Sequence, residues 1–154
     1  MGNPDSRRRR RKPIKPTKSQ LNALEKLKRL DWGLHVIWGK RGIPSHLCGI
    51  LSVEPEKDTE TASHKFFSEH FRLFKMKETL EDLKFIRKTD SLGGCHAVFQ
   101  QFFYELPINN AFTSVHMDKN NLVKKVDICY HPDVYVELPI EKKQEIYWIY
   151  LMRS

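Results

Sequence analysis

Hydrophobic and polar positions follow different periods along the chain, and these periods predict its elements. Near the start, leucine recurs at every third position, as is typical of one face of a helix: Leu21, Leu24, Leu27 and Leu30. Thr17 and Gln20 come before this stripe with the spacing of a capping box. The pattern therefore predicts a helix of about twelve residues that begins near Thr17.

After residue 31 the apolar period changes from about three to two. Residues 32–38 alternate as in a half-buried strand, and residues 39–42 (Gly-Lys-Arg-Gly) have the composition of a turn. Residues 46–53 are then expected to return as the second strand of a hairpin. Residues 54–63 are acidic and lack apolar periodicity, which predicts an exposed loop.

The middle of the chain contains one ambiguous segment, one expected helix and one expected strand. Residues 64–76 are rich in Phe and fit a helix or a strand equally well. Residues 77–88 carry apolar residues at helical spacing and predict a short helix. The Ser-Leu-Gly-Gly run at 91–94 breaks the chain, and residues 95–106, apolar on both faces, predict a central strand.

The last third of the chain predicts a meander of antiparallel strands at residues 112–117, 122–130 and 134–138. Turn-forming residues at 118–121 and 131–133 separate these strands. Residues 146–152 fit a closing strand or a terminal helix. The expected fold class is therefore α+β and strand-dominated: an antiparallel sheet, sandwich-like or barrel-like, with an N-terminal helix.

Charge divides the 154 residues into an arm and a body. Of the 27 Lys and Arg residues, eight lie in residues 1–18, where Asp5 is the only acid. The rest of the chain is close to neutral, so the net charge of +8 belongs almost wholly to this arm. We expect residues 1–18 to be a disordered basic arm and residues 19–154 to be a single globular domain.

The cysteines and the N-terminus suggest an intracellular protein. The chain holds three cysteines, Cys48, Cys95 and Cys129, which lie far apart and cannot all pair with one another. The N-terminus is polar and has no apolar segment of a signal peptide. No stretch approaches the roughly 18 apolar residues of a membrane span. Free thiols in a reducing compartment are the expectation.

The arm predicts contact with a polyanion. Arginine binds phosphate well, because its planar guanidinium group can donate to two oxygens at once. The basic side chains that would neutralise phosphates are Arg7, Arg8, Arg9, Arg10, Arg11, Lys12, Lys15 and Lys18. We therefore expect DNA or RNA as the partner, and binding that weakens steeply with salt. Such a run is also typical of a nuclear localisation signal, which indicates the nucleus.

A second candidate set lies in the expected hairpin, where Trp32, Trp38, Lys40 and Arg41 combine aromatic and basic side chains. Exposed tryptophans there would stack on bases and extend the binding surface of the arm. The layout, an Arg-rich arm before a compact β-rich body, is similar to that of small viral structural proteins. That likeness implies a capsid-like, matrix-like or accessory role in which the body self-associates or binds a partner.

Two alternatives use the same arm differently. Gly2, followed by Ser6, fits the N-myristoylation pattern, and a polybasic stretch is the usual second membrane signal. This alternative predicts a peripheral protein on the cytoplasmic face of an anionic membrane. The other alternative is a protein-interaction module whose arm serves only to bind a nuclear import receptor.

Catalysis, metals and cofactors are not expected. The chain lacks the phosphate-binding glycine motifs and the Gly-x-Ser-x-Gly motif. Cys95 and His96 are neighbours, but adjacent residues of a strand point to opposite faces, so they cannot act as a pair. The other histidines and cysteines, such as His46 and Cys48 or His64 and His70, lack the spacing of a zinc site.

Overall fold

The computed structural model describes residues 12–134, which contain two helices and six strands; residues 1–11 and 135–154 lie outside the described part. The elements in chain order are α1 (Lys18–Leu30), β1 (His35–Trp38), β2 (Pro44–Cys48), α2 (Thr59–His70), β3 (Leu83–Ser91), β4 (Gly94–Phe103), β5 (Leu106–Asp118) and β6 (Val123–Ile128). The expected strands at 134–138 and 146–152 fall at or beyond the end of this range.

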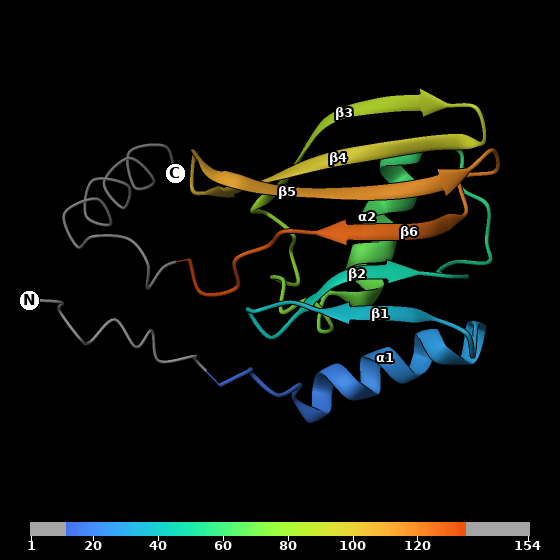
Figure 1. Cartoon of the computed structure of the whole chain (residues 1–154). Coiled ribbons are helices and arrows are strands. Elements are labelled where there is room, and N and C mark those ends of the chain that lie inside the picture. The colour runs from blue at the N-terminus through green and yellow to red at the C-terminus, as the bar shows by residue number, and fades with distance from the viewer. Residues whose placement is uncertain (1–11, 135–154) are drawn as a thin grey trace, which may run out of the picture.

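The six strands form one antiparallel sheet in the order β1-β2-β6-β5-β4-β3. The predicted strand-dominated α+β fold with an antiparallel sheet and an N-terminal helix is confirmed. Figure 1 shows β1 and β3 at the two edges. Because these edge strands do not pair with each other, the sheet formed by the described residues is open, not closed into a barrel or doubled into a sandwich.

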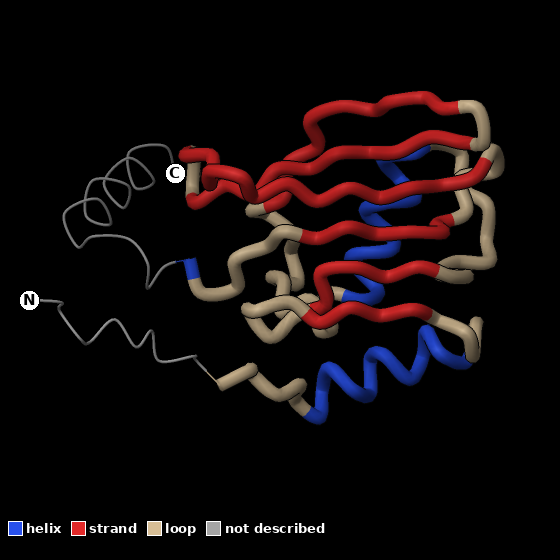
Figure 2. The backbone as a smooth tube through the Cα atoms, in the orientation of Figure 1, coloured by secondary structure: helices blue, strands red, loops and turns tan. Residues whose placement is uncertain are grey.

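Helix α2 covers one face of the sheet and forms the core with it. Figure 2 shows α2 crossing behind the strands, on the side away from the viewer. Phe67 of α2 is 1% exposed, and its ring centroid lies 5.9 Å from that of Phe99 in β4, edge to face. Inward-facing residues of four successive strands are fully buried under the helix: Leu47, Val126, Val115 and Ala97. We call this side the covered face.

The predicted first helix and its capping box are confirmed. The Thr17 side chain accepts a hydrogen bond from the backbone N–H of Gln20, and the Gln20 side chain accepts one from the backbone N–H of Thr17. The leucine stripe is only half buried. Leu24 and Leu27 lie in the core, whereas the leucines at the two ends of the stripe are exposed, because a period of three drifts around a helix of 3.6 residues per turn.

The expected acidic loop at 54–63 is shorter than predicted, since α2 already begins at Thr59. Asp58 caps this helix by accepting a hydrogen bond from the N–H of Thr61 at 2.7 Å. Glu60 in the first turn also favours the positive end of the helix dipole. The ambiguous Phe-rich segment is therefore helical as far as His70.

The helix predicted for 77–88 is wrong, because β3 begins at Leu83. Leu80 has a φ of +54° in the preceding turn, a conformation that interrupts a helix. Leu83 and Phe85 then alternate toward the core, and the register shifts between Phe85 and Arg87. The same alternation points Ile86 away from the core and leaves it exposed, so the three apolar residues at helical spacing do not share one face of the strand.

Candidate nucleic-acid interface

The junction between the basic arm and the body is fixed by Gln20, which is 1% exposed. Its amide group donates hydrogen bonds to the carbonyl oxygens of Gly42, at 2.8 Å, and Leu73, at 3.0 Å. Its side-chain oxygen accepts a hydrogen bond from the N–H of Thr17 at 2.9 Å. The first turn of α1 is therefore tied both to the turn between β1 and β2 and to the segment after α2.

The last residues of the arm lie directly against the β1–β2 turn. Gly42 has a φ of +73°, and a Cβ atom there would lie 2.6 Å from Cγ2 of Ile14. The same position is 3.5 Å from Nζ of Lys75. Only glycine leaves room for this approach, so the arm joins the body beside the turn and next to an ammonium group.

Six basic side chains surround this junction, and we call them the basic end. Its members are Lys12, Lys15 and Lys18 before and at the start of α1, Lys40 and Arg41 in the turn, and Lys75 after α2. Lys75 is half-buried and the others are exposed. None of the six forms an ion pair within residues 12–134. The first turn of α1 holds no acid, and its helix dipole adds further positive potential.

The structure brings only part of the second candidate set to this end. Lys40 and Arg41 belong to the basic end, whereas Trp32 follows the far end of α1, roughly 20 Å away for a helix of this length. Trp32 is 81% exposed, and Trp38 is half-buried and packs against the core. The tryptophans therefore do not share a strand or a patch. Arg7–Arg11 and Gly2 lie outside the described residues.

The uncovered side of the sheet holds a cluster of histidines that the sequence analysis did not assemble. Two neighbouring rows of side chains cross the strands there, and we call them the histidine face. One row contains His46, Asp127, Ser114, Val98 and Arg87, and the other contains Cys48, Lys125, His116, His96 and Thr89. Their two-residue spacing along β2, β4, β5 and β6 was the available signal.

Asp127 of β6 connects the rows. Its carboxylate lies 2.7 Å from Nδ1 of His46 on β2 and 3.3 Å from Nε2 of His116 on β5. The ammonium group of Lys125 lies 3.4 Å from the same carboxylate. The His116 ring also lies beside that of His96, with centroids 5.0 Å apart. The imidazoles of His46, His96 and His116 remain partly exposed in this arrangement.

The charges of this face shift two pKa values. Burial raises the pKa of Asp127, but the hydrogen bond from His46 and the charge of Lys125 outweigh it and hold the pKa below its usual range. Burial, followed by the nearby charge of Lys125, lowers the pKa of His116, although Asp127 opposes this effect. At neutral pH His116 is therefore uncharged and Asp127 is ionised.

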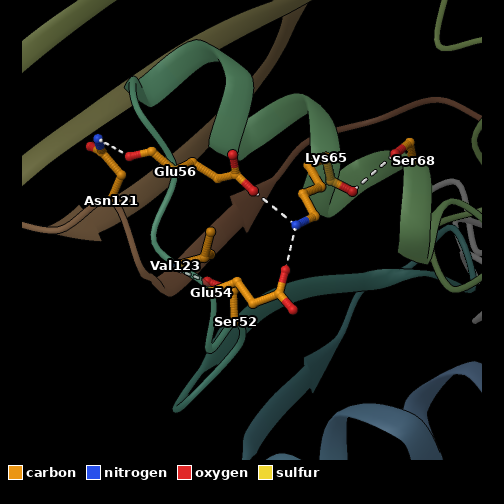
Figure 3. A network of polar contacts seen from close by, with 7 residues as sticks. All are labelled: Ser52, Glu54, Glu56, Lys65, Ser68, Asn121 and Val123. Carbon is orange, nitrogen blue, oxygen red and sulfur yellow. Dashed lines mark hydrogen bonds and ion pairs between the residues drawn. The ribbon is translucent and has the colours of Figure 1, made fainter.

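On the other side of the molecule, an ion-pair network joins α2 to the loop after β2 (Figure 3). Nζ of Lys65 lies 2.9 Å from the carboxylate of Glu54 and 2.8 Å from that of Glu56. Asn121 donates to the backbone carbonyl of Glu56 at 3.0 Å. The ammonium group is satisfied by two carboxylates, which suits a structural clasp better than capture of an anion.

A cavity of about 300 Å³ lies beside this clasp, between α1 and α2. His70 lines it, is 9% exposed, and its Nδ1 has no hydrogen-bond partner among residues 12–134. Burial, and then the charge of Lys26, lowers the pKa of His70 to about 4. The imidazole is therefore neutral at physiological pH and packs against the ring of Phe66, with 4.8 Å between the centroids.

A second buried polar cluster lies at the other end of the sheet. Tyr130 donates to the carboxylate of Asp82 at 2.6 Å, and Gln101 donates to the same oxygen at 3.2 Å. Burial and this hydrogen bond raise the pKa of Tyr130. Gln101 also exchanges two hydrogen bonds with the backbone of His131, so the cluster fixes the chain after β6.

Residues 12–134 contain neither a cluster of metal ligands nor a membrane-spanning helix. No group of three or more His, Cys, Asp or Glu side chains in this range is arranged to hold a metal ion. Neither helix found there is long and apolar enough to cross a membrane. The predicted opposition of Cys95 and His96 is confirmed, since Cys95 is buried on the covered face and His96 lies on the histidine face.

Comparison with known proteins finds no family model, no curated protein and no solved structure that matches this chain. The interpretation of the basic end and of the histidine face therefore rests on their own geometry and chemistry.

Proposed function

We propose that this protein binds nucleic acid through its Arg-rich arm together with the basic end of the body. The observation that carries the proposal is the anchoring of Ile14 and Gln20 on the β1–β2 turn, so that Lys40 and Arg41 lie beside the end of the arm. Cations on the body then continue the run of Arg7 to Lys18 without intervening acids. A strand of phosphates following the arm would meet further cations where it reaches the domain.

Nucleic acid suits this surface better than a lipid bilayer does. Both carry phosphate diesters, which arginine binds bidentately, but only a nucleic acid presents them as one continuous chain that can follow Arg7–Arg11 onto the basic end. Binding of this kind fixes position but carries little sequence information. The run also fits a nuclear localisation signal, so the proposed place of action is the nucleus.

The test compares the full chain with a variant in which Arg7, Arg8, Arg9, Arg10 and Arg11 are replaced by Gln. Binding to a labelled duplex is measured across a salt series. Loss of five phosphate contacts should reduce the slope of log K against log salt by about 4.5 and weaken binding strongly at low salt. The double variant K40Q/R41Q should reduce the slope by about two at most.

Lys88 supplies the matched control, because it is an exposed cation of β3 far from the basic end in the fold. Lys88→Gln should leave duplex binding unchanged. Anionic vesicles form the second arm of the experiment. Equal duplex binding by the five-Arg variant would overturn the proposal, and tight vesicle binding with none to oligonucleotides would favour the lipid-anchored alternative.

A further inference from the structure

The histidine face is one side of the antiparallel sheet, and no helix of the described residues covers it. Figures 1 and 2 show this side of the sheet toward the viewer, with α2 behind it. Its residues are partly exposed: the side chains of His46, His116 and Lys125 retain 23%, 35% and 42% of their accessible surface. Of the ten residues in the two rows only Val98 is buried, at 4% exposure, and it lies outside the main core cluster, so the charged and ring-bearing side chains of this face are not part of that core. Within residues 12–134, nothing covers this face, and it is open to a partner.

Several strands carry imidazole or phenyl side chains on this face. His96 and His116 present neighbouring imidazoles, and Phe112 of β5 is 42% exposed in the next row, opposite Gln100. Lys84 of β3 holds its ammonium group 4.4 Å from the centre of the Phe102 ring. Nucleobases stack on surfaces of this kind, on His as well as Phe, without requiring a particular sequence.

The charges of the face favour an anionic partner. Lys84, Arg87 and Lys125 carry three positive charges across β3 and β6, and Asp127 is the one acid in the two rows that define the face. That carboxylate is already engaged by two imidazoles and one ammonium group. A second copy of the chain would place the same cations opposite one another, whereas a phosphate backbone would neutralise them.

We propose that the histidine face binds single-stranded nucleic acid, with bases stacked on its imidazole and phenyl rings and phosphates beside Lys84, Arg87 and Lys125. Base stacking requires unpaired bases, so the face should select single strands over duplexes. The proposal rests on the proposed function of the arm and names its substrate class. The two parts are connected through β2, which carries His46 four residues after Gly42 of the arm junction.

The test uses the full chain with a labelled mixed-sequence single strand and the matched duplex at physiological ionic strength. The variants H96A and F112A each remove one ring from the face. Each should weaken single-strand binding by about 5-fold to 150-fold, as expected for one lost stacking contact, and leave duplex binding nearly unchanged. Equal losses for both oligonucleotides, or no loss for either, would overturn the proposal.

Arg87 and Lys88 provide a matched pair for the charges. They are neighbours on β3, opposite Val98 and Ala97 respectively, and therefore point to the histidine face and to the other side. R87Q should weaken single-strand binding, and K88Q should not. Equal effects of the two changes would show that the cations of β3 act only through net charge.

A measurement on the unaltered protein avoids any dependence on variant folding. Addition of the single strand should shift the imidazole NMR signals of His96 and His116 and leave that of His70, buried beside α1, unchanged. Absence of such shifts while the strand binds would place it on the arm alone; the proposed function would stand and the face proposal would fall. Concentration-dependent dimerisation abolished by H96A would instead assign the face to self-association.

Discussion

The two faces of the sheet are built from the same strands but have opposite chemistry. On β4, Cys95, Ala97 and Phe99 point to the covered face and are buried, whereas His96 and Gln100 point to the other side and remain partly exposed. Adjacent residues of a strand always face opposite ways, so each strand carries both patterns at once. A slip of one residue would bury imidazoles and expose apolar side chains, which fixes the register.

This division separates stability from binding. The covered face is held by apolar contacts with α2, in which Phe67 touches rings of three other residues: Phe66, Phe74 and Phe99. The open face is held by half-exposed polar contacts centred on Asp127, which contribute little stability in water. Substitutions on the open face should consequently change interactions with partners more than they change the free energy of unfolding.

The largest expected effect is the loss of stability on truncating a buried side chain that packs on the covered face. Phe67→Ala should lower the free energy of unfolding by about 3–5 kcal/mol, because it leaves a cavity at a residue that is 1% exposed. Urea denaturation followed by circular dichroism measures this loss. The matched change on the open face, Phe112→Ala, should cost only about 1–2 kcal/mol, since its ring is already 42% exposed. Similar losses for both variants would contradict the division between the faces.

A smaller effect is expected from acid, through the buried His70 of the helix that covers the sheet. Its pKa is about 4 in the folded protein, against an ordinary value of 6.5. Between these values the unfolded chain binds a proton that the folded protein does not, so stability falls as pH falls. The loss from this group approaches roughly 3 kcal/mol near pH 4.

Urea denaturation at a series of pH values tests this expectation. His70→Gln should flatten the stability profile between pH 6.5 and about 4, because the titrating group is gone. His96→Gln serves as the control on the open face and should retain the wild-type slope. If His70→Gln has the same dependence of stability on pH as the wild-type protein, groups other than His70 cause the acid sensitivity.

Local sequence signals predicted the parts of the fold that local interactions determine. The capping box of Thr17 and Gln20 gave the start of α1, and the turn residues at 118–121 placed the connection between β5 and β6. The segment 77–88 was mispredicted because its apolar spacing fits a helix. From Leu83 onward it is instead a strand, since it pairs with β4 with one register shift after Phe85. Tertiary context overrode the local period there.

The sites divide in the same way. The basic arm is visible in the sequence as a run of charge, and its function stays a prediction. The histidine face depends on β2 pairing with β6, which brings His46 to Asp127 across 81 residues of sequence. Nothing local marks those two residues as neighbours. Gln20 likewise looked like a capping residue only, although its amide group also joins two distant loops.

The smallest expected effect tests the electrostatics of the open face itself. Asp127→Asn removes the negative charge that stabilises the His116 imidazolium, leaving burial and Lys125 to act unopposed. The pKa of His116, already below its ordinary value, should fall further, and Lys125→Gln should move it in the opposite direction. NMR titration of the imidazole signals measures both shifts.

Asp90→Asn is the control. It alters an ion pair with Lys88 outside the two rows and should leave the His116 signal unchanged. Shifts of opposite sign in Asp127→Asn and Lys125→Gln would establish that the pKa of His116 responds to single charges on this face. Bound phosphates should then raise the pKa of His116 as well. Shifts of the same sign would refute this electrostatic description.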